Sequence, residues 1–192
     1  MTTRVKHDHN VNKLTTTALM AAVIFVVTYM IRIPMPIASG GYLNIGDAPV
    51  YIAASLLGGP GGMIAAAVGS ALSDLSAGYV VYIIPTAIIK GLMGFVCGKL
   101  MERVGFARFV IAAVIGGAIM VGGYAAFETV LFNLNQALVS ALLNVIQWGC
   151  GVAVAAAFYP VVPRIKKSLG LTKKGQTADK QKKGSNEKAG IS

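Results

Sequence analysis

Charged and polar side chains inside long apolar runs are the residues of this sequence that can do chemistry. Lys90 lies midway along the apolar stretch 79–101, and Glu128 lies near the end of the stretch 108–130. A charged group at the centre of a membrane helix costs about 2.5–3.5 kcal/mol on insertion scales, so it needs a function or a partner. Lys90 is therefore either a binding residue or half of an ion pair with Glu128 or Asp74.

Other polar residues share helical faces with these two. Tyr82, Thr86 and Lys90 follow one another at four-residue spacing, as do Tyr124 and Glu128, so each set lies on one face. Several such faces predict a pocket that opens outward and holds a flat ring among aromatic side chains. The predicted binding residues are Asn44, Asp74, Tyr82, Lys90, Tyr124, Glu128, Asn144, Gln147 and Trp148.

These polar residues also have purely structural interpretations. Asp47 stands at a predicted helix start, where an N-cap role fits better than ligand binding. Asp74 fits a helix cap or a partner for Tyr79 equally well. Asn144 and Gln147 can serve only to bridge neighbouring helices.

The elements that position these residues are membrane helices. Of 192 residues, 55% are hydrophobic and 12% charged, whereas soluble domains average about 25% charged residues. The apolar runs are continuous rather than alternating, which favours helices over membrane strands. We predict an all-α integral membrane protein, a bundle of six transmembrane helices. The predicted spans are 14–33, 47–57, 63–77, 79–101, 108–130 and 137–162.

The second and third spans are short and are separated by Gly58-Gly59-Pro60-Gly61-Gly62. Four glycines and a proline predict a tight turn there rather than a break in one long helix. Spans this short would mismatch the bilayer if they faced lipid, so we expect longer neighbours to surround them.

Cationic residues indicate the orientation and the domain limits. The net charge of +10 is concentrated before residue 14, at 99–108 and after 163, a pattern that fits cytoplasmic loops rather than nucleic-acid binding. Both termini are therefore predicted to be cytoplasmic, in a multi-pass protein of the cell membrane. We expect a head at 1–13, a membrane domain at 14–165 and a disordered Lys-rich tail at 166–192.

Small residues at four-residue spacing, such as Ala18 and Ala22, let helices approach closely. Internal packing and docking onto another membrane subunit both fit this spacing. The sequence contains no P-loop, no HExxH and no nucleophile–base constellation, so we expect no catalysis, no metal site and no cofactor bound by this chain. It also lacks an evident energy source of its own.

The stretch 41–94, GYLNIGDAPVYIAASLLGGPGGMIAAAVGSALSDLSAGYVVYIIPTAIIKGLMG, resembles the S components of energy-coupling factor (ECF) transporters. It is similar to the branch that includes carriers of thiamine precursors, as are Glu128 and the later NVIQ at 144–147. In the first span, Ala18 and Ala22 match the docking motif of that family.

The resemblance implies a vitamin-binding subunit that works with a transmembrane coupling (T) subunit and two cytoplasmic ATPases, which use the ATP. It implies capture of the vitamin outside the cell and toppling of the subunit in the membrane to release it. Three carboxylates against Lys90 favour a neutral or cationic flat heterocycle such as hydroxymethylpyrimidine, thiamine or pyridoxine. The alternatives are a stand-alone carrier and, from another class, an integral membrane enzyme of lipid metabolism.

Overall fold

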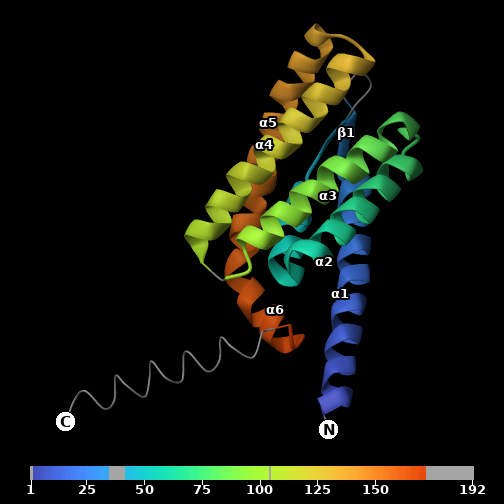
Figure 1. Cartoon of the computed structure of the whole chain (residues 1–192). Coiled ribbons are helices and arrows are strands. Elements are labelled where there is room, and N and C mark those ends of the chain that lie inside the picture. Colours follow the sequence, from blue (N-terminus) through green and yellow to red (C-terminus); the bar gives the residue numbers. More distant parts are fainter. Residues whose placement is uncertain (1, 35–41, 104, 172–192) are drawn as a thin grey trace, which may run out of the picture.

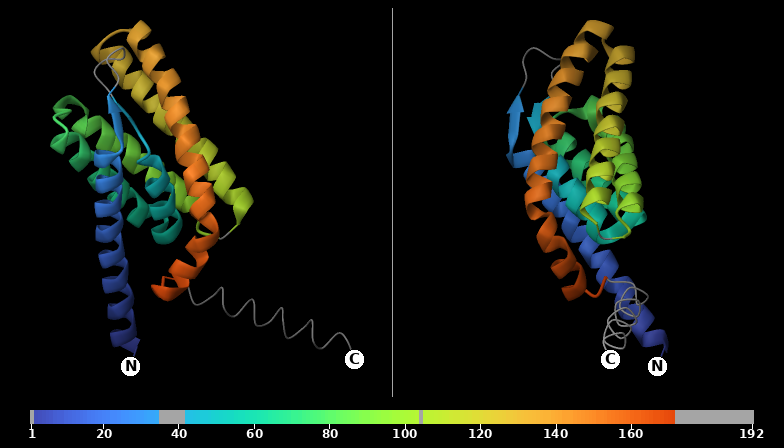
Figure 2. Two further views of the ribbon diagram at one scale, coloured as in Figure 1. Left: turned by 180° about the vertical axis from the view of Figure 1, so that it is seen from behind. Right: turned by 90° about the vertical axis from the view of Figure 1, so that its left-hand side faces the viewer.

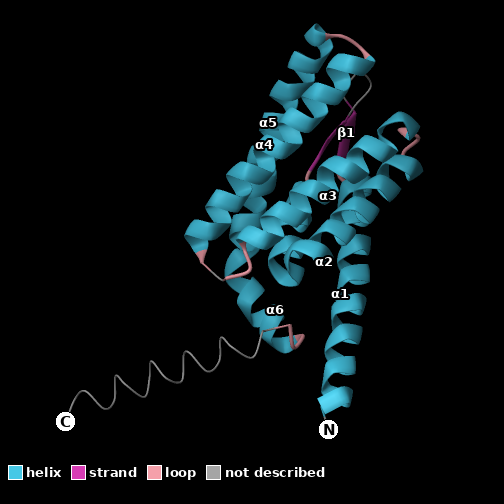
Figure 3. Ribbon diagram, viewed as in Figure 1, coloured by secondary structure: helices cyan, strands magenta, loops and turns pink. Residues whose placement is uncertain are grey.

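The computed structural model describes residues 2–34, 42–103 and 105–171, and long helices dominate it (Figures 1 and 3). A short antiparallel hairpin joins the first two helices, with Arg32 opposite Asn44 and Pro34 opposite Tyr42. The sequence had predicted helices alone. The elements are α1 (Thr2–Met30), β1 (Arg32–Pro34), β2 (Tyr42–Asn44), α2 (Asp47–Ser76), η1 (Val80–Tyr82), α3 (Ile83–Leu100), α4 (Phe106–Leu131), α5 (Leu134–Phe158), η2 (Tyr159–Val161) and α6 (Val162–Ser168).

Five helices of the described chain are long and apolar enough to cross a membrane. This confirms the all-helical membrane architecture but not six separate spans, because predicted spans 47–57 and 63–77 belong to the one element α2. Helix α1 runs without interruption through the predicted head–membrane boundary at residue 13. Of the predicted disordered tail 166–192, residues 166–168 belong to helix α6, and the residues after 171 lie outside the described part of the chain.

Helix α2 is broken at Gly58, whose φ of 74° and ψ of −172° are not helical. This left-handed φ is readily available only to glycine. A Cβ built on Gly62 would lie 2.9 Å from Cα of Ala54, a contact that a continuous helix could not make across eight residues. The chain therefore doubles back at Gly58. The residues from Pro60 onward are helical, so the turn takes up fewer residues than the predicted cluster Gly58–Gly62.

The leg of α2 before this break, residues 47–57, forms the centre of the fold. Its 11 residues span about 17 Å as a helix, roughly half of the bilayer's hydrocarbon core. Nearly all of its side chains are buried, and Tyr51 is 0% exposed, with its hydroxyl donating to the Ala113 carbonyl at 3.1 Å. Longer helices surround the leg, as expected for a segment too short to face lipid.

Two antiparallel pairs enclose this leg (Figure 2). The second leg of α2 packs along α3, and α4 forms a long hairpin with α5, while α1 lies against α2. The described ends of the chain, in α1 and after α6, lie at the same end of the molecule (Figure 1). The α2–α3 and α4–α5 connections lie at the opposite end.

The α2–α3 contact depends on glycines that face each other. A Cβ on Gly94 would lie 2.5 Å from the carbonyl oxygen of Gly62, and one on Gly62 would lie 2.8 Å from that of Gly94. Real Cβ atoms do not approach so closely, so the two backbones touch where any larger residue would separate them.

We expect Gly94→Ala to lower the thermal midpoint of the detergent-purified chain by several degrees, because overpacking a tight contact costs about 1–3 kcal/mol. Gly122→Ala is the matched control. A Cβ at Gly122 in α4 meets nothing within 4 Å, and alanine is the better helix former, so this midpoint should hold or rise. Equal behaviour of the two variants would contradict the close α2–α3 contact.

Candidate substrate-binding site

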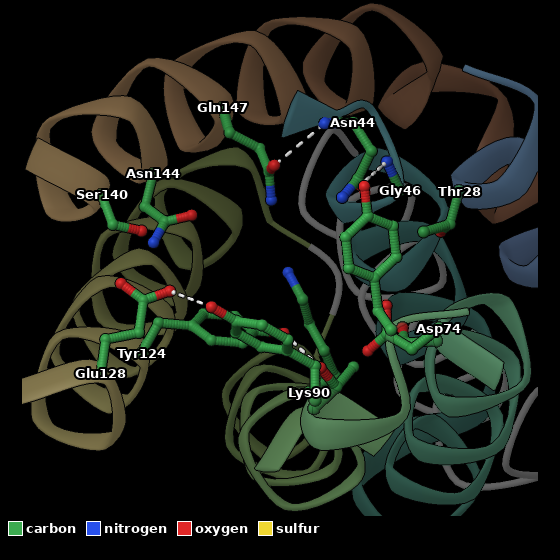
Figure 4. A pocket seen from close by; sticks show the side chains of 14 residues that line it. Thr28, Asn44, Gly46, Asp74, Lys90, Tyr124, Glu128, Ser140, Asn144 and Gln147 are labelled. Atoms are coloured by element: carbon green, nitrogen blue, oxygen red, sulfur yellow. Dashed lines mark hydrogen bonds between the residues drawn. The ribbon is translucent and has the colours of Figure 1, made fainter. Parts of the chain in front are cut away.

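A polar pocket lies between the helices, lined by residues near the α2–α3 and α4–α5 connections (Figure 4). Its empty space, including the part open to solvent, is about 560 Å³. Eight of the nine predicted binding residues line it; the exception is Trp148. The lining residues are Thr28, Asn44, Gly46, Ser70, Asp74, Tyr79, Tyr82, Thr86, Lys90, Tyr124, Glu128, Ser140, Asn144 and Gln147.

Lys90 rises from α3 into the pocket, and its ammonium group forms an ion pair with Asp47. The sequence had suggested Glu128 or Asp74 as the partner, and the structure replaces both with Asp47. The Lys90 side chain is 5% exposed and that of Asp47 is 0% exposed. Removing one member of such a pair leaves an uncompensated charge in an apolar interior, so each residue requires the other.

Asp47 is not the N-cap that its position suggested. Gly46 is the N-cap and makes no side-chain capping bond, and Asp47 is the first residue of α2. A carboxylate there is favoured by the partial positive charge of the helix N-terminus. One oxygen meets Lys90, and the other accepts a 3.1 Å hydrogen bond from Nε2 of Gln147.

Gln147 links this ion pair to the chain that enters α2. Its Oε1 accepts a hydrogen bond from the backbone N–H of Asn44 at 3.0 Å. Asn44 in turn accepts from the N–H of Gly46 through Oδ1 at 2.7 Å. A Cβ on Gly46 would overlap the side-chain oxygens of Thr28 and Asn44, so any larger residue here would force both side chains to move. These contacts hold β2 and the start of α2 against α5.

Glu128 lies at the α4–α5 side of the pocket (Figure 4). Its Oε1 accepts a 3.1 Å hydrogen bond from the hydroxyl of Tyr82, while Oε2 is buried, with the Ser140 hydroxyl near the carboxyl but no hydrogen bond of normal length to Oε2 among the described residues. The whole residue is only 3% exposed. A buried acceptor without a donor is costly, so this oxygen is suited to receive a donor from a ligand.

The pocket has a second polar side, where Thr28, Ser70 and Asp74 from α1 and α2 face it. All three are at least 95% buried, and Oγ1 of Thr28 has no hydrogen-bond partner in the described chain. Between the two sides, the Thr86 hydroxyl lies 2.9 Å from that of Tyr124. The rings of Tyr79 and Tyr82 meet edge to face at 6.5 Å.

Comparison with known sequences identifies the family. The profile of ECF-type riboflavin transporter S components matches residues 8–164, most of the chain. This chain belongs to the S-component family of ECF transporters. It is a multi-pass membrane protein and a transporter subunit, not an enzyme.

Two relatives of this S component align with it over nearly the whole of their own length. An uncharacterized protein of Pyrococcus woesei is 34% identical over 146 residues, covering 76% of this chain and 95% of its own. The thiamine precursor transporter HmpT of Lactococcus lactis subsp. cremoris (strain MG1363) is 27% identical over 161 residues, covering 84% of this chain and 93% of its own.

Trp148 lies outside the pocket of this S component. Its indole N–H donates to the Ala113 carbonyl at 2.9 Å, and a Cβ on Gly117 would overlap the indole ring. The side chain therefore packs against α4. The α5 residues that do reach the pocket are Ser140, Asn144 and Gln147, one stripe at spacings of four and three.

Other pocket residues were missed because their types fit ordinary packing. Ser70 stands four residues before Asp74 on the same face of α2, as Ser140 stands four before Asn144, and this spacing was the available signal. Asp47 does not line the pocket, and its pairing with Lys90 was missed because an acid at a helix start suggests a cap. Nothing in the local sequence marked Thr28 or Gly46.

The predicted docking residues lie on the outer face of α1. Ala18 and Ala22 are both exposed in the isolated S component, whereas Thr17, Met20 and Ile24 face the rest of the molecule. The small pair is therefore not used for packing within the described chain, and a helix of another subunit can approach it closely.

Proposed function

We propose that this S component captures a small, flat, neutral or cationic vitamin or vitamin precursor outside the cell. Hydroxymethylpyrimidine, thiamine and pyridoxine represent the class. The observation that carries the proposal is the buried carboxyl of Glu128, whose Oε2 accepts no hydrogen bond of normal length among the described residues, beside the tyrosines of the pocket. A nitrogen heterocycle with an amino or ring N–H group supplies that donor and stacks on aromatic rings.

The charges around the pocket favour the same class. Asp47 cancels the charge of Lys90, and the other acidic side chains that line the pocket are Asp74 and Glu128. HmpT is a thiamine precursor transporter, and a thiamine precursor belongs to the same class of small heterocycle. The matching family is that of riboflavin transporters, and riboflavin is another flat heterocycle but a larger one.

The ligand class is tested by thermal unfolding of the detergent-purified chain with B vitamins and their precursors, riboflavin included. A ligand that binds only the folded protein raises the midpoint as its concentration increases. We expect a saturable shift with a small amine-bearing heterocycle. A shift with riboflavin alone would contradict the small-ligand proposal, and no shift with any member would contradict vitamin capture.

Glu128→Gln should weaken binding of that ligand roughly 10–100-fold, because a hydrogen bond to a charged acceptor contributes about 1.5–3 kcal/mol. The matched control is Glu102→Gln, at an exposed glutamate that pairs with Lys99 beyond the end of α3. This control should bind as the unmodified chain does. Unchanged affinity in Glu128→Gln would remove Glu128 from the site.

We propose further that the S component delivers its ligand through a transmembrane coupling subunit and two cytoplasmic ATPases, which use the ATP. The pocket then opens to the outside and both termini are cytoplasmic, as the charge distribution favours. Support for docking comes from the exposed pair Ala18 and Ala22 on α1. Such a surface suits close packing with another helix in the membrane.

Ala18→Trp should abolish co-purification with the coupling subunit and leave vitamin binding unchanged, because the indole keeps the helices apart without touching the pocket. Ala118→Trp is the control, since Ala118 is also exposed, on α4. Loss of the complex in both variants, or in neither, would contradict docking through this face of α1.

A further inference from the structure

We propose that Asp47, which does not line the pocket, sets the pocket's charge selectivity by engaging Lys90, so that the unmodified site rejects phosphorylated or carboxylated ligands. This inference rests on the proposed function and names the chemistry that the same site excludes. It also makes Asp47 a positioning residue that acts through Lys90.

Lys90 is the residue on which an anion would bind. No other Lys or Arg lines the pocket among the described residues, and residues 35–41, which the structure does not describe, contain none. A phosphate group in this pocket would need the Lys90 ammonium group as its counter-charge, since Asp74 and Glu128 repel it.

The ammonium group of Lys90 is already engaged on three sides. It pairs with Asp47, lies 3.0 Å from Sδ of Met120 and lies 5.8 Å from the ring centre of Tyr124. Asp47 and Met120 take two of the three N–H donors, and an anion that reached the third would meet an ammonium charge that Asp47 already neutralises. Displacing Asp47 would leave its buried carboxylate without a counter-charge, which is strongly unfavourable.

Asp47 is itself held in place and cannot follow a ligand. It is 0% exposed, and Nε2 of Gln147 donates to its second oxygen. On the side of Lys90 the pocket thus presents an ion pair without net charge, and its other acidic groups are Asp74 and Glu128. This arrangement admits donors and cations, and it repels the phosphate esters of the same vitamins.

The test replaces Asp47 by asparagine, which keeps the shape and can still accept from Gln147 but frees Lys90. Inorganic phosphate and pyrophosphate serve as probes in thermal unfolding of the purified chain. We expect a saturable rise of the midpoint in Asp47→Asn, which starts lower than the unmodified chain, and no such rise in the unmodified chain. The double variant Asp47→Asn/Lys90→Met should lose the rise, since it removes the freed ammonium.

Absence of a phosphate response in folded Asp47→Asn would overturn the proposal, as would a response that persists in the double variant. If Asp47→Asn does not fold, the same phosphate titration of the unmodified chain tests the proposal. A saturable rise of its midpoint that Lys90→Met removes would overturn the proposal, and the absence of a rise would support it.

A vitamin that binds should lose roughly tenfold or more in affinity when phosphorylated, a difference of about 1.4 kcal/mol or more. Equal affinity for a vitamin and its ester would overturn the charge selectivity while leaving vitamin capture intact. Absence of binding by every vitamin would instead contradict the proposed function, and the phosphate probes would still test Asp47.

Discussion

The buried ion pair between Asp47 and Lys90 constrains the rest of this S component. Lys90 lies midway along a helix that crosses the apolar layer, so its partner must reach the same depth. Asp47 meets this requirement as the first residue of α2, which therefore starts inside the protein. This explains why the leg 47–57 is only about half as long as the bilayer core and why the chain must double back at Gly58.

The same constraint produces a polar interior within an apolar shell. On α3, Thr86 and Lys90 are buried in the pocket, while Ile84 and Ile88 on the opposite face are 71% and 64% exposed. A soluble protein would bury the isoleucines and expose the lysine. The buried polar groups of the pocket thus depend on neighbouring residues for hydrogen bonds. A ligand must supply the donors or acceptors that those neighbours lack.

Periodicity and charge placement predicted most of this arrangement. Lys90 and Glu128 could be recognised because charges inside apolar spans are costly, and the four-residue spacing located Tyr82 and Tyr124 beside them. The pairing of Lys90 with Asp47 could not be predicted, because it depends on the depth at which α2 begins. The prediction of Trp148 as a pocket residue was wrong for a related reason. Sequence spacing alone does not determine which residues of a polar helix face point into the pocket and which pack against α4.

If this S component supplies a vitamin site to an ATP-driven transporter, uptake of a labelled small vitamin such as thiamine should require its partners. The measurement uses liposomes that contain the S component with its coupling subunit and ATPases. We expect accumulation that depends on ATP and on the complete complex. Accumulation by the S component alone, driven by an ion gradient without ATP, would show instead a stand-alone carrier.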